Sequence, residues 1–213
     1  MDLLMKEADE KQYQKKHQMK KRVRQEMLAA IKGELEQNRG MSPEARQELD
    51  HIVSEMGTML HLTPARRNNL RMLLEICEIG RLTLPASLRN KPVWEMSPEE
   101  YQKYVKHSET GSRIVSGAPE TKKIAQDLMA HHENWDGTGY PKGLKGREIP
   151  LLARIARVVD FYQEATQGQL PTEKKMLEEL IKGMKFAEGT LLDPEIAEVF
   201  ARVLENRFGS YLQ

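Results

Sequence analysis

Residues 131–141 read HHENWDGTGYP, and a glycine-rich segment that ends at Ile149-Pro150 follows them. Two adjacent histidines supply imidazole nitrogens, which are frequent metal ligands. Each glycine after them gives up side-chain packing in exchange for backbone freedom, and the Tyr140-Pro141 pair adds a fixed corner. The stretch therefore predicts a metal site beside a shaped pocket that can take a phosphate.

The pattern continues towards the C-terminus through Gly143-Leu144, Gly146, Ile149-Pro150, Ala153-Arg154-Ile155 and Asp160. Taken together, it resembles the signature of HD-GYP domains, a branch of the HD metal-dependent phosphohydrolases that opens the cyclic dinucleotide cyclic di-GMP. The resemblance is specific over residues 107–160 and looser over the rest of the domain. It implies an all-α fold in which residues 41–213 form an HD-domain helical bundle.

Composition bounds the class of protein. The chain has 213 residues, 39% of them hydrophobic and 31% charged, so it can bury one core and keeps a strongly solvated surface. A net charge of +1 argues against a protein that coats nucleic acid or an acidic membrane. The single cysteine, Cys77, excludes an intrachain disulfide and favours a reducing compartment. Because charges interrupt the first apolar runs, we expect no signal peptide, no membrane contact from this segment and a cytoplasmic location.

Residues 1–37 are predicted to form one long connector helix, since they contain no proline, a single glycine and many strong helix formers. This segment also resembles the last helix of GGDEF (diguanylate cyclase) domains, on the residues Leu3-Leu4, Ala8-Asp9, Tyr13 and Lys15-Lys16. This second resemblance implies that the sequence is the C-terminal part of a longer signalling chain. Such a helix often pairs with a copy of itself, which would make a homodimer, and the alternative is a monomeric solvated tail.

Local signals place the helices of the domain. Four helix starts are marked by an N-cap residue with a proline directly after it, at the first helical position. They are Ser42-Pro43, Thr63-Pro64, Ser97-Pro98 and Asp193-Pro194. Glu100 adds a capping box to Ser97. With their apolar stripes, the predicted helices cover residues 43–61, 64–76, 98–107, a segment from Gly111, 120–132, a segment from Pro150, 172–185 and 193–208.

Four metal ligands of the family are present unchanged, namely His107, His131, His132 and Asp160. Asp160 interrupts an otherwise apolar helix, where a buried carboxylate needs a cation, hydrogen bonds or a metal. Arg154 is the basic alternative, either as the partner of Asp160 or as a phosphate contact. Adjacent helical residues point about 100° apart, so His131 and His132 can share one site only near the end of their helix.

The resemblance fails at the pair of residues that gives HD proteins their name. Where the family reads His-Asp-X-Gly-Lys, residues 77–81 read CEIGR. Glu78 keeps the charge but carries its carboxylate about 1.5 Å further out, and it is assigned as a fifth metal ligand and a catalytic residue. Cys77 is interpreted as an inert buried thiol. A further family ligand falls near Ala45, which has no ligand atom, and the nearby His51 is interpreted as a surface imidazole.

The expected nucleotide pocket combines cations with the loop that carries Gly139-Tyr140-Pro141, here called the GYP loop. The resemblance assigns substrate binding to Gly139, Tyr140, Pro141, Arg154 and Arg81. Arg81 stands where the family has a lysine that reaches the phosphate, and it is assigned a catalytic role too. Its guanidinium is a planar fork rather than a point charge. Lys142 and Lys145 are interpreted as solvated loop charges.

Hydrolysis at two metal ions needs both ions to be held. Three histidines with Glu78 can hold one ion, and a second would lose its ligands near Ala45 and Cys77. We therefore expect one divalent ion (iron, manganese or zinc) rather than two, with no metal as the alternative. The leading prediction is a degenerate HD-GYP signalling domain with weak or lost activity, which keeps metal or nucleotide binding and offers the GYP loop to protein partners. The alternatives are an active phosphodiesterase that hydrolyses cyclic di-GMP and a non-catalytic dimerisation module.

Overall fold

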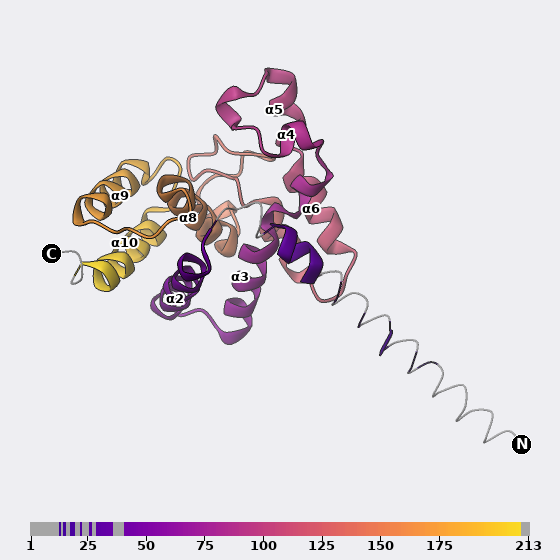
Figure 1. Ribbon diagram of the computed structural model, residues 1–213, viewed down its shortest axis with the longest axis horizontal. Coiled ribbons are helices and arrows are strands. Elements are labelled where there is room, and N and C mark those ends of the chain that lie inside the picture. The colour runs from indigo at the N-terminus through magenta and orange to yellow at the C-terminus, as the bar shows by residue number, and fades with distance from the viewer. Residues whose placement is uncertain are drawn as a thin grey trace, which may run out of the picture.

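The computed structural model describes residues 13, 15, 18, 19, 22, 26, 29–35 and 41–209. Within this part of the chain the regular structure is helical, and strand-like pairing is limited to an isolated bridge between Glu188 and Leu192. The predicted all-α class is confirmed. The α-helices (Figure 1) are α2 (Pro43–Met59), α3 (Pro64–Ile76), α4 (Ala86–Arg89), α5 (Pro98–Tyr104), α6 (His107–Ser116), α7 (Ala125–Met129), α8 (Leu151–Thr166), α9 (Lys174–Ala187) and α10 (Pro194–Phe208). Short 3₁₀ turns lie between them at η1 (Cys77–Thr83), η2 (Val93–Glu95), η3 (Lys122–Ile124) and η4 (Gly146–Glu148).

N-terminal caps start the longer helices where the sequence predicts them. The hydroxyl of Ser42 accepts an amide hydrogen bond at the start of α2, and Thr63 and Asp193 do the same at α3 and α10. At α5 the reciprocal capping box between Ser97 and Glu100 is complete. Each cap satisfies a backbone N–H that the helix would leave unpaired, and it contributes about 1 kcal/mol.

One hydrophobic core joins α2, α3, α8, α9 and α10. Each of these helices contributes at least one side chain with no exposed surface, in chain order Ile52, Leu73, Ile155, Met184 and Phe200. Burying an apolar side chain of this size contributes about 1.5–3 kcal/mol. The contacts hold α8 against α3, α7, α9 and α10 and so fix the position of the polar residues that it carries.

The middle of the domain differs from the predicted helices. The helix predicted over 98–107 ends at Tyr104, and α6 begins at His107 and runs through Gly111 instead of starting there. Gly111 serves close packing, because a Cβ on it would lie 2.7 Å from Cδ2 of Leu128. Gly111, which the sequence suggested as a helix start, therefore lies inside α6 at its contact with α7.

The helix predicted over 120–132 is reduced to the turn η3 and the short helix α7. The carbonyl of Leu128 accepts from the side chain of His131, where a continuing helix would need the backbone amide of His132. Side chains that compete for backbone groups in this way end helices. Both histidines consequently lie in the turn beyond α7.

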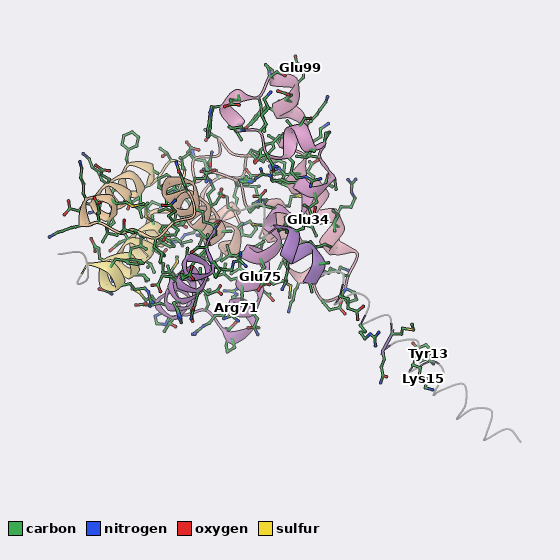
Figure 2. The ribbon with its side chains drawn as sticks, viewed as in Figure 1. Tyr13, Lys15, Glu34, Arg71, Glu75 and Glu99 are labelled. Carbon is green, nitrogen blue, oxygen red and sulfur yellow. The ribbon has the colours of Figure 1, made fainter. Side chains whose placement is uncertain are left out.

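The described part of the N-terminal segment ends against the domain. Residues 29–35 are helical, and Leu35 is buried in the core. Lys32 forms an ion pair with Glu75 of α3. Figure 2 labels Glu75 and, on the N-terminal helix, Glu34 at this junction.

Most of the connector helix predicted over residues 1–37, including Leu3-Leu4 and Ala8-Asp9, lies outside the described residues. Its pairing with a second copy stays a prediction. Among the residues that the structure does describe, no helix combines the length and the apolar character that crossing a membrane requires.

Candidate metal centre

The close approach of η1 to α6 brings the first two candidate ligands together. A Cβ on Gly80 would lie 1.9 Å from the carbonyl oxygen of His107, so any side chain at this position would push η1 away from α6. Glu78, two residues before this contact, is thereby placed beside the ring of His107. The turn after α7 adds His131 and His132.

Four side chains converge on one point. Oε1 of Glu78 lies 3.5 Å from Nε2 of His131 and 3.4 Å from Nε2 of His132, and its Oε2 lies 3.8 Å from Nε2 of His107. One donor atom from each residue lies within 4.8 Å of the other three. Across the described residues, this is the one group of three or more His, Cys, Asp or Glu side chains that converges so closely. Of the five predicted metal ligands, the structure brings these four together.

Hydrogen bonds behind two of the rings fix the positions of their protons. Nδ1 of His107 donates to the carbonyl of Tyr104 at 2.7 Å, and Nδ1 of His131 donates to the carbonyl of Leu128 at 2.5 Å. A neutral imidazole carries one proton, so both Nε2 atoms present lone pairs to Glu78. The Nε2 atoms of all three cluster histidines are buried and have no hydrogen-bond partner in the described part of the chain. Lone pairs that face a carboxylate need a cation between them, and the set therefore fits a divalent metal ion.

Burial sets the charges of the cluster. It lowers the pKa of His107 to about 3 and also lowers the pKa of His132, so both imidazoles are neutral near pH 7. Burial on its own would raise the pKa of Glu78, and the histidines would lower it only by turning N–H groups towards it; with Nε2 lone pairs turned towards it instead, a cation is what keeps this carboxylate charged. A negative carboxylate facing neutral imidazoles is the state in which these groups bind metals.

Asp160 lies behind the cluster. Its Oδ2 is 3.6 Å from Nδ1 of His132, on the opposite side of the ring from the Nε2 that faces Glu78. The guanidinium of Arg157 lies 3.2 Å from the same oxygen. The structure thus leaves Asp160 apart from the other four predicted ligands, and its ionic partner is Arg157 rather than Arg154.

Arg154 connects α8 to the start of α10 and to the residue that precedes Pro150. Its NH1 group lies 2.5 Å from Oδ2 of the buried Asp193, and its Nε donates to the carbonyl of Ile149 at 3.0 Å. The guanidinium also lies 5.8 Å from the centre of the Trp135 ring. Of the two alternatives for Arg154, pairing with Asp160 is not what the structure shows, since Arg154 pairs with Asp193, and a phosphate contact would have to replace these bonds.

The GYP loop is held in shape by a buried carboxylate. The two oxygens of Glu133 accept hydrogen bonds from the amides of Lys142 at 2.8 Å and Leu144 at 3.1 Å. Gly139 passes so close to the preceding turn that a Cβ would lie 2.2 Å from the amide nitrogen of Asn134. The loop is therefore a rigid wall whose backbone is fixed from inside.

The GYP loop lies next to the cluster through the ring of Tyr140. The centre of its ring lies 5.0 Å from that of His132 and 6.1 Å from that of His107, and the Tyr140–Pro141 peptide bond is cis. Burial raises the pKa of the Tyr140 phenol, which stays neutral. Lys142 and Lys145 are exposed, in agreement with their interpretation as solvated loop charges.

A cavity of about 310 Å³ opens beside the cluster, and its lining includes Glu78, Arg81, Tyr104, His132 and Asp160. NH1 of Arg81 lies 3.5 Å from Oε2 of Glu78, and the guanidinium lies 5.4 Å from the centre of the Tyr104 ring. NH2 of Arg81 donates to a backbone carbonyl at 2.5 Å. The cavity therefore combines the candidate metal centre with a cation that Glu78 and a backbone carbonyl hold in place, and a phosphate contact would have to share or replace these bonds.

Cys77, which stands where the HD pattern has a histidine, lines the same small cavity as His131. Cys77 is buried, with its Sγ 3.9 Å from the carbonyl oxygen of Leu74, and it is not among the four converging residues. Ala45 is buried and His51 is exposed. A cavity of about 30 Å³ here is lined in part by Cys77 and His131, which is room for about one water molecule. These positions agree with the interpretation of Cys77 as a buried thiol and of His51 as a surface imidazole.

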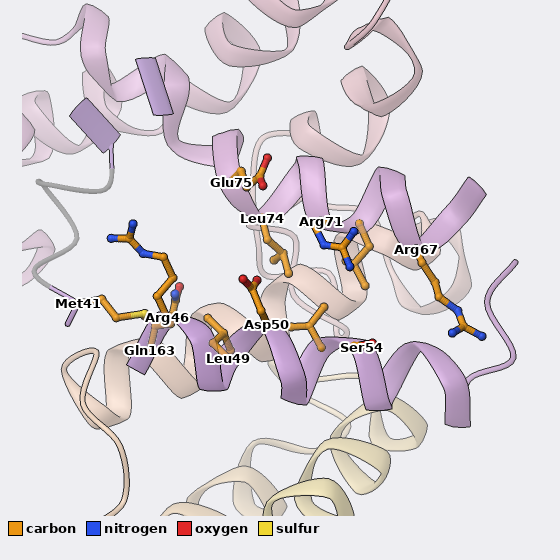
Figure 3. Close-up of a pocket in the computed structure, with 12 residues that line it drawn as sticks. Met41, Arg46, Leu49, Asp50, Ser54, Arg67, Arg71, Leu74, Glu75 and Gln163 are labelled. Atoms are coloured by element: carbon orange, nitrogen blue, oxygen red, sulfur yellow. The ribbon is translucent and has the colours of Figure 1, made fainter. Parts of the chain in front are cut away.

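A groove of about 140 Å³ lies between α2 and α3 (Figure 3). Its walls carry charges of both signs, from Arg46, Asp50, Arg67, Arg71 and Glu75. None of the residues that line it is one of the four converging donors. We therefore place the candidate site at the cluster and not in this groove.

Two residues with clear structural roles at the site were not singled out by sequence reasoning. Glu133 holds the GYP loop through its hydrogen bonds. In the sequence it follows two histidines directly, and no local pattern distinguishes a loop-holding carboxylate there. Arg157 pairs with Asp160, and a signal for it was present, since charged residues three apart on a helix face one another. Arg157 also donates to Oδ1 of Asn134 at 3.2 Å, a contact that no local pattern indicates.

The sequence is similar to those of several known proteins. The chain matches the HD domain family over residues 14–196. A cyclic di-GMP phosphodiesterase of Thermotoga maritima is 34% identical over 154 residues, which make up 71% of this chain and 40% of that protein. The cyclic di-GMP phosphodiesterase response regulator RpfG of Xanthomonas campestris pv. campestris is 25% identical over 179 residues, 83% of this chain and 47% of that protein. The 3'3'-cGAMP-specific phosphodiesterase 3 of Vibrio cholerae is 28% identical over 155 residues, 72% of this chain and 33% of that protein.

Among solved structures, a crystal structure of a cyclic GMP-AMP specific phosphodiesterase of Vibrio cholerae is similar, with a TM-score of 0.62 and 21% identity over 87% of this chain and 50% of that one. At this identity the likeness concerns the fold alone. The chain spans half or less of the length of these relatives. The family match covers most of the sequence and agrees with the helical fold and the converging histidines, and the chain therefore belongs to the HD domain family.

Proposed function

We propose that this domain holds one divalent metal ion through Glu78, His107, His131 and His132, and binds a cyclic dinucleotide beside it, with weak or lost phosphodiesterase activity. One observation carries the proposal. Three buried Nε2 atoms, which have no hydrogen-bond partner among the described residues, face a single carboxylate. Such an arrangement costs free energy until a cation lies between these atoms, so packing alone does not account for it.

The four donor atoms restrict the identity of the metal ion. Three imidazole nitrogens with one carboxylate oxygen suit zinc, and they also suit iron and manganese. When bound, the ion would supply Lewis-acid stabilisation of a phosphoryl oxygen and a bound water with a lowered pKa. The carbonyls of Tyr104 and Leu128 would keep two of the histidine rings in the orientation that binding needs.

Arg81 and Tyr104 would receive the phosphate. Both line the cavity next to Glu78, and burial raises the pKa of Tyr104, which leaves a neutral phenol. A phosphodiester oxygen in this cavity would meet the fork of Arg81, a charge-assisted hydrogen-bond donor. The GYP loop, with Tyr140 against His132, would close the other side of the site.

Weak turnover is expected because further ligands for a second ion are missing. A pair of ions stabilises both the attacking and the leaving oxygen, and a single ion does not. Ala45 has no donor atom, and Cys77 stands outside the converging group. Asp160 is engaged by Arg157 on the far side of a ring.

The ligand class is taken from the relatives. The proteins named above are phosphodiesterases for cyclic di-GMP, 3'3'-cGAMP or cyclic GMP-AMP. All of these ligands are cyclic dinucleotides, whose phosphodiesters carry the negative charge that the cavity would neutralise. We therefore propose a cyclic dinucleotide as the ligand of this domain.

The test combines metal analysis of protein purified without chelator, calorimetric titration with cyclic di-GMP and 3'3'-cGAMP, and a hydrolysis assay with manganese or iron(II). We expect one ion per chain, nucleotide binding and little turnover. His131→Ala should lose the ion, while Glu109→Ala, an exposed change on α6, should keep it. Protein that binds neither metal nor nucleotide would contradict the proposal.

An active phosphodiesterase is the second candidate, and one observation favours it. Despite the change from the family's aspartate, Glu78 lies within 3.8 Å of a nitrogen of each histidine in the cluster. In that case Glu78 and Arg81 are catalytic residues. Sustained turnover of cyclic di-GMP that Glu78→Ala abolishes and Glu109→Ala preserves would support this candidate, whereas one bound ion without turnover would support the first.

A further inference from the structure

Arg157 and Asp160 lie one helical turn apart on α8, behind the ring of His132. NH1 of Arg157 is 3.2 Å from Oδ2 of Asp160, and that oxygen is 3.6 Å from Nδ1 of His132. The side chains of Arg157 and Asp160 are 14% and 26% exposed. A pair sheltered to this degree is screened less by salt than a surface pair.

The geometry gives the two nitrogens of this ring different partners. Nε2 of His132 faces Glu78 at 3.4 Å, and Nδ1 faces Asp160. The two nitrogens of an imidazole point to different sides of the ring, so an ion held at Nε2 lies away from the carboxylate behind Nδ1. That carboxylate can instead accept the Nδ1 proton, which leaves the Nε2 lone pair free for the ion.

We propose that Arg157 and Asp160 are positioning residues that orient His132 as a metal ligand, with Asp160 accepting the Nδ1 proton and Arg157 holding Asp160 in place. The inference rests on the proposed function, because it concerns the ion that the four donors would hold. Backbone carbonyls occupy the equivalent place behind His107 and His131. A carboxylate behind a ligating histidine fixes the tautomer and raises the basicity of the other nitrogen.

A second contact ties the pair to the GYP loop. Nε of Arg157 donates to Oδ1 of Asn134 at 3.2 Å, and Nδ2 of Asn134 donates to Oγ1 of Thr138 at 3.1 Å. The guanidinium therefore bridges α8 and the loop that carries Tyr140. A displacement of the loop would move Arg157 and, through Asp160, the metal-binding ring.

Zn²⁺ titration of the chelator-treated chain, in competition with a chromophoric chelator, tests this role. Asp160→Ala should weaken Zn²⁺ binding by about 10- to 100-fold, as is usual for groups behind a ligating histidine. The number of ions bound per chain should not change. Arg157→Met should weaken binding by a smaller factor, and the double variant should bind as Asp160→Ala does, because Arg157 acts through Asp160.

Glu48→Gln is the matched control. It breaks the ion pair with Arg207 between α2 and α10, in which the Glu48 side chain is 23% exposed, and it should leave Zn²⁺ affinity unchanged. The unfolding midpoints of the metal-free variants separate a general loss of stability from a loss of affinity. An Asp160→Ala protein that binds Zn²⁺ as tightly as the unaltered chain, or binds one ion fewer, would overturn the inference. Failure of the unaltered chain to bind Zn²⁺ would overturn the proposed function itself.

Discussion

Gly139 is required by its surroundings. A Cβ there would lie 2.2 Å from the amide nitrogen of Asn134 and 2.5 Å from Cα of Glu133, and both are backbone atoms that cannot turn aside. Gly139→Ala should therefore displace the GYP loop, lower the free energy of unfolding by about 1–3 kcal/mol and weaken nucleotide binding. Urea unfolding and calorimetric titration measure the two effects.

Gly183 on α9 offers a matched control, since a Cβ on this residue would lie 3.8 Å from the nearest atom, Cζ of Phe161. Alanine is the better helix former by about 1 kcal/mol. Gly183→Ala should be at least as stable as the unaltered protein. If Gly139→Ala were equally stable, the close approach at Gly139 would not constrain the loop.

Asp127 on α7 makes a contribution to stability that depends on pH. Burial raises its pKa to about 6, while the unfolded chain has a value of about 3.9. Between these values the folded state binds more protons than the unfolded state, so the free energy of unfolding falls as the pH rises. Asp127→Asn should therefore add about 1 kcal/mol at pH 7.5, a figure reduced for partial exposure, and nothing near pH 4. Urea unfolding at both pH values tests this, and an equal effect at the two would contradict it.

At the scale of elements, the helix starts that carry an N-cap could be predicted from sequence, whereas the start of α6 and the end of α7 could not. Ser42, Thr63 and Ser97 cap helices through groups within a few residues, so a local pattern is sufficient. The end of α7 depends on the side chain of His131, which takes the carbonyl of Leu128 because the ring is held in the cluster. That competition involves packing between distant segments, which no local pattern contains.

The GYP loop as an element depends on Glu133, which is 1% exposed and accepts from the amides of Lys142 and Leu144. Hydrogen bonds to a charged group contribute about 1.5–3 kcal/mol each. Glu133→Gln replaces one acceptor oxygen by an amide that cannot accept, so hydrogen exchange at the two backbone amides should become faster. In the control Glu148→Gln, at an exposed residue that accepts from the amide of Lys145, exchange should change at Lys145 alone. Unchanged exchange at Lys142 and Leu144 would show that Glu133 does not hold the loop.

At the scale of the whole molecule, the site joins η1, α6 and the turn after α7 through residues 78, 107 and 131–132. The family resemblance could identify these residues because the ligand types stand at the family's positions. It could not show that Asp160 lies behind His132, since that depends on how α8 packs against the rest of the bundle. The pairing of Asp160 with Arg157 is local to α8 and could have been predicted from their spacing of three residues.

A bound ion should therefore stabilise the whole domain, because its ligands come from segments that unfolding separates. At a Zn²⁺ concentration of about 100 times the dissociation constant, linkage predicts about 2.7 kcal/mol. For a domain of this size that corresponds to a rise in Tm of about 5–10 °C. Differential scanning calorimetry of the chelator-treated chain, with and without Zn²⁺, measures the rise. His131→Ala should abolish it and Glu109→Ala should retain it, whereas a rise that survives in His131→Ala would place the stabilising ion outside the cluster.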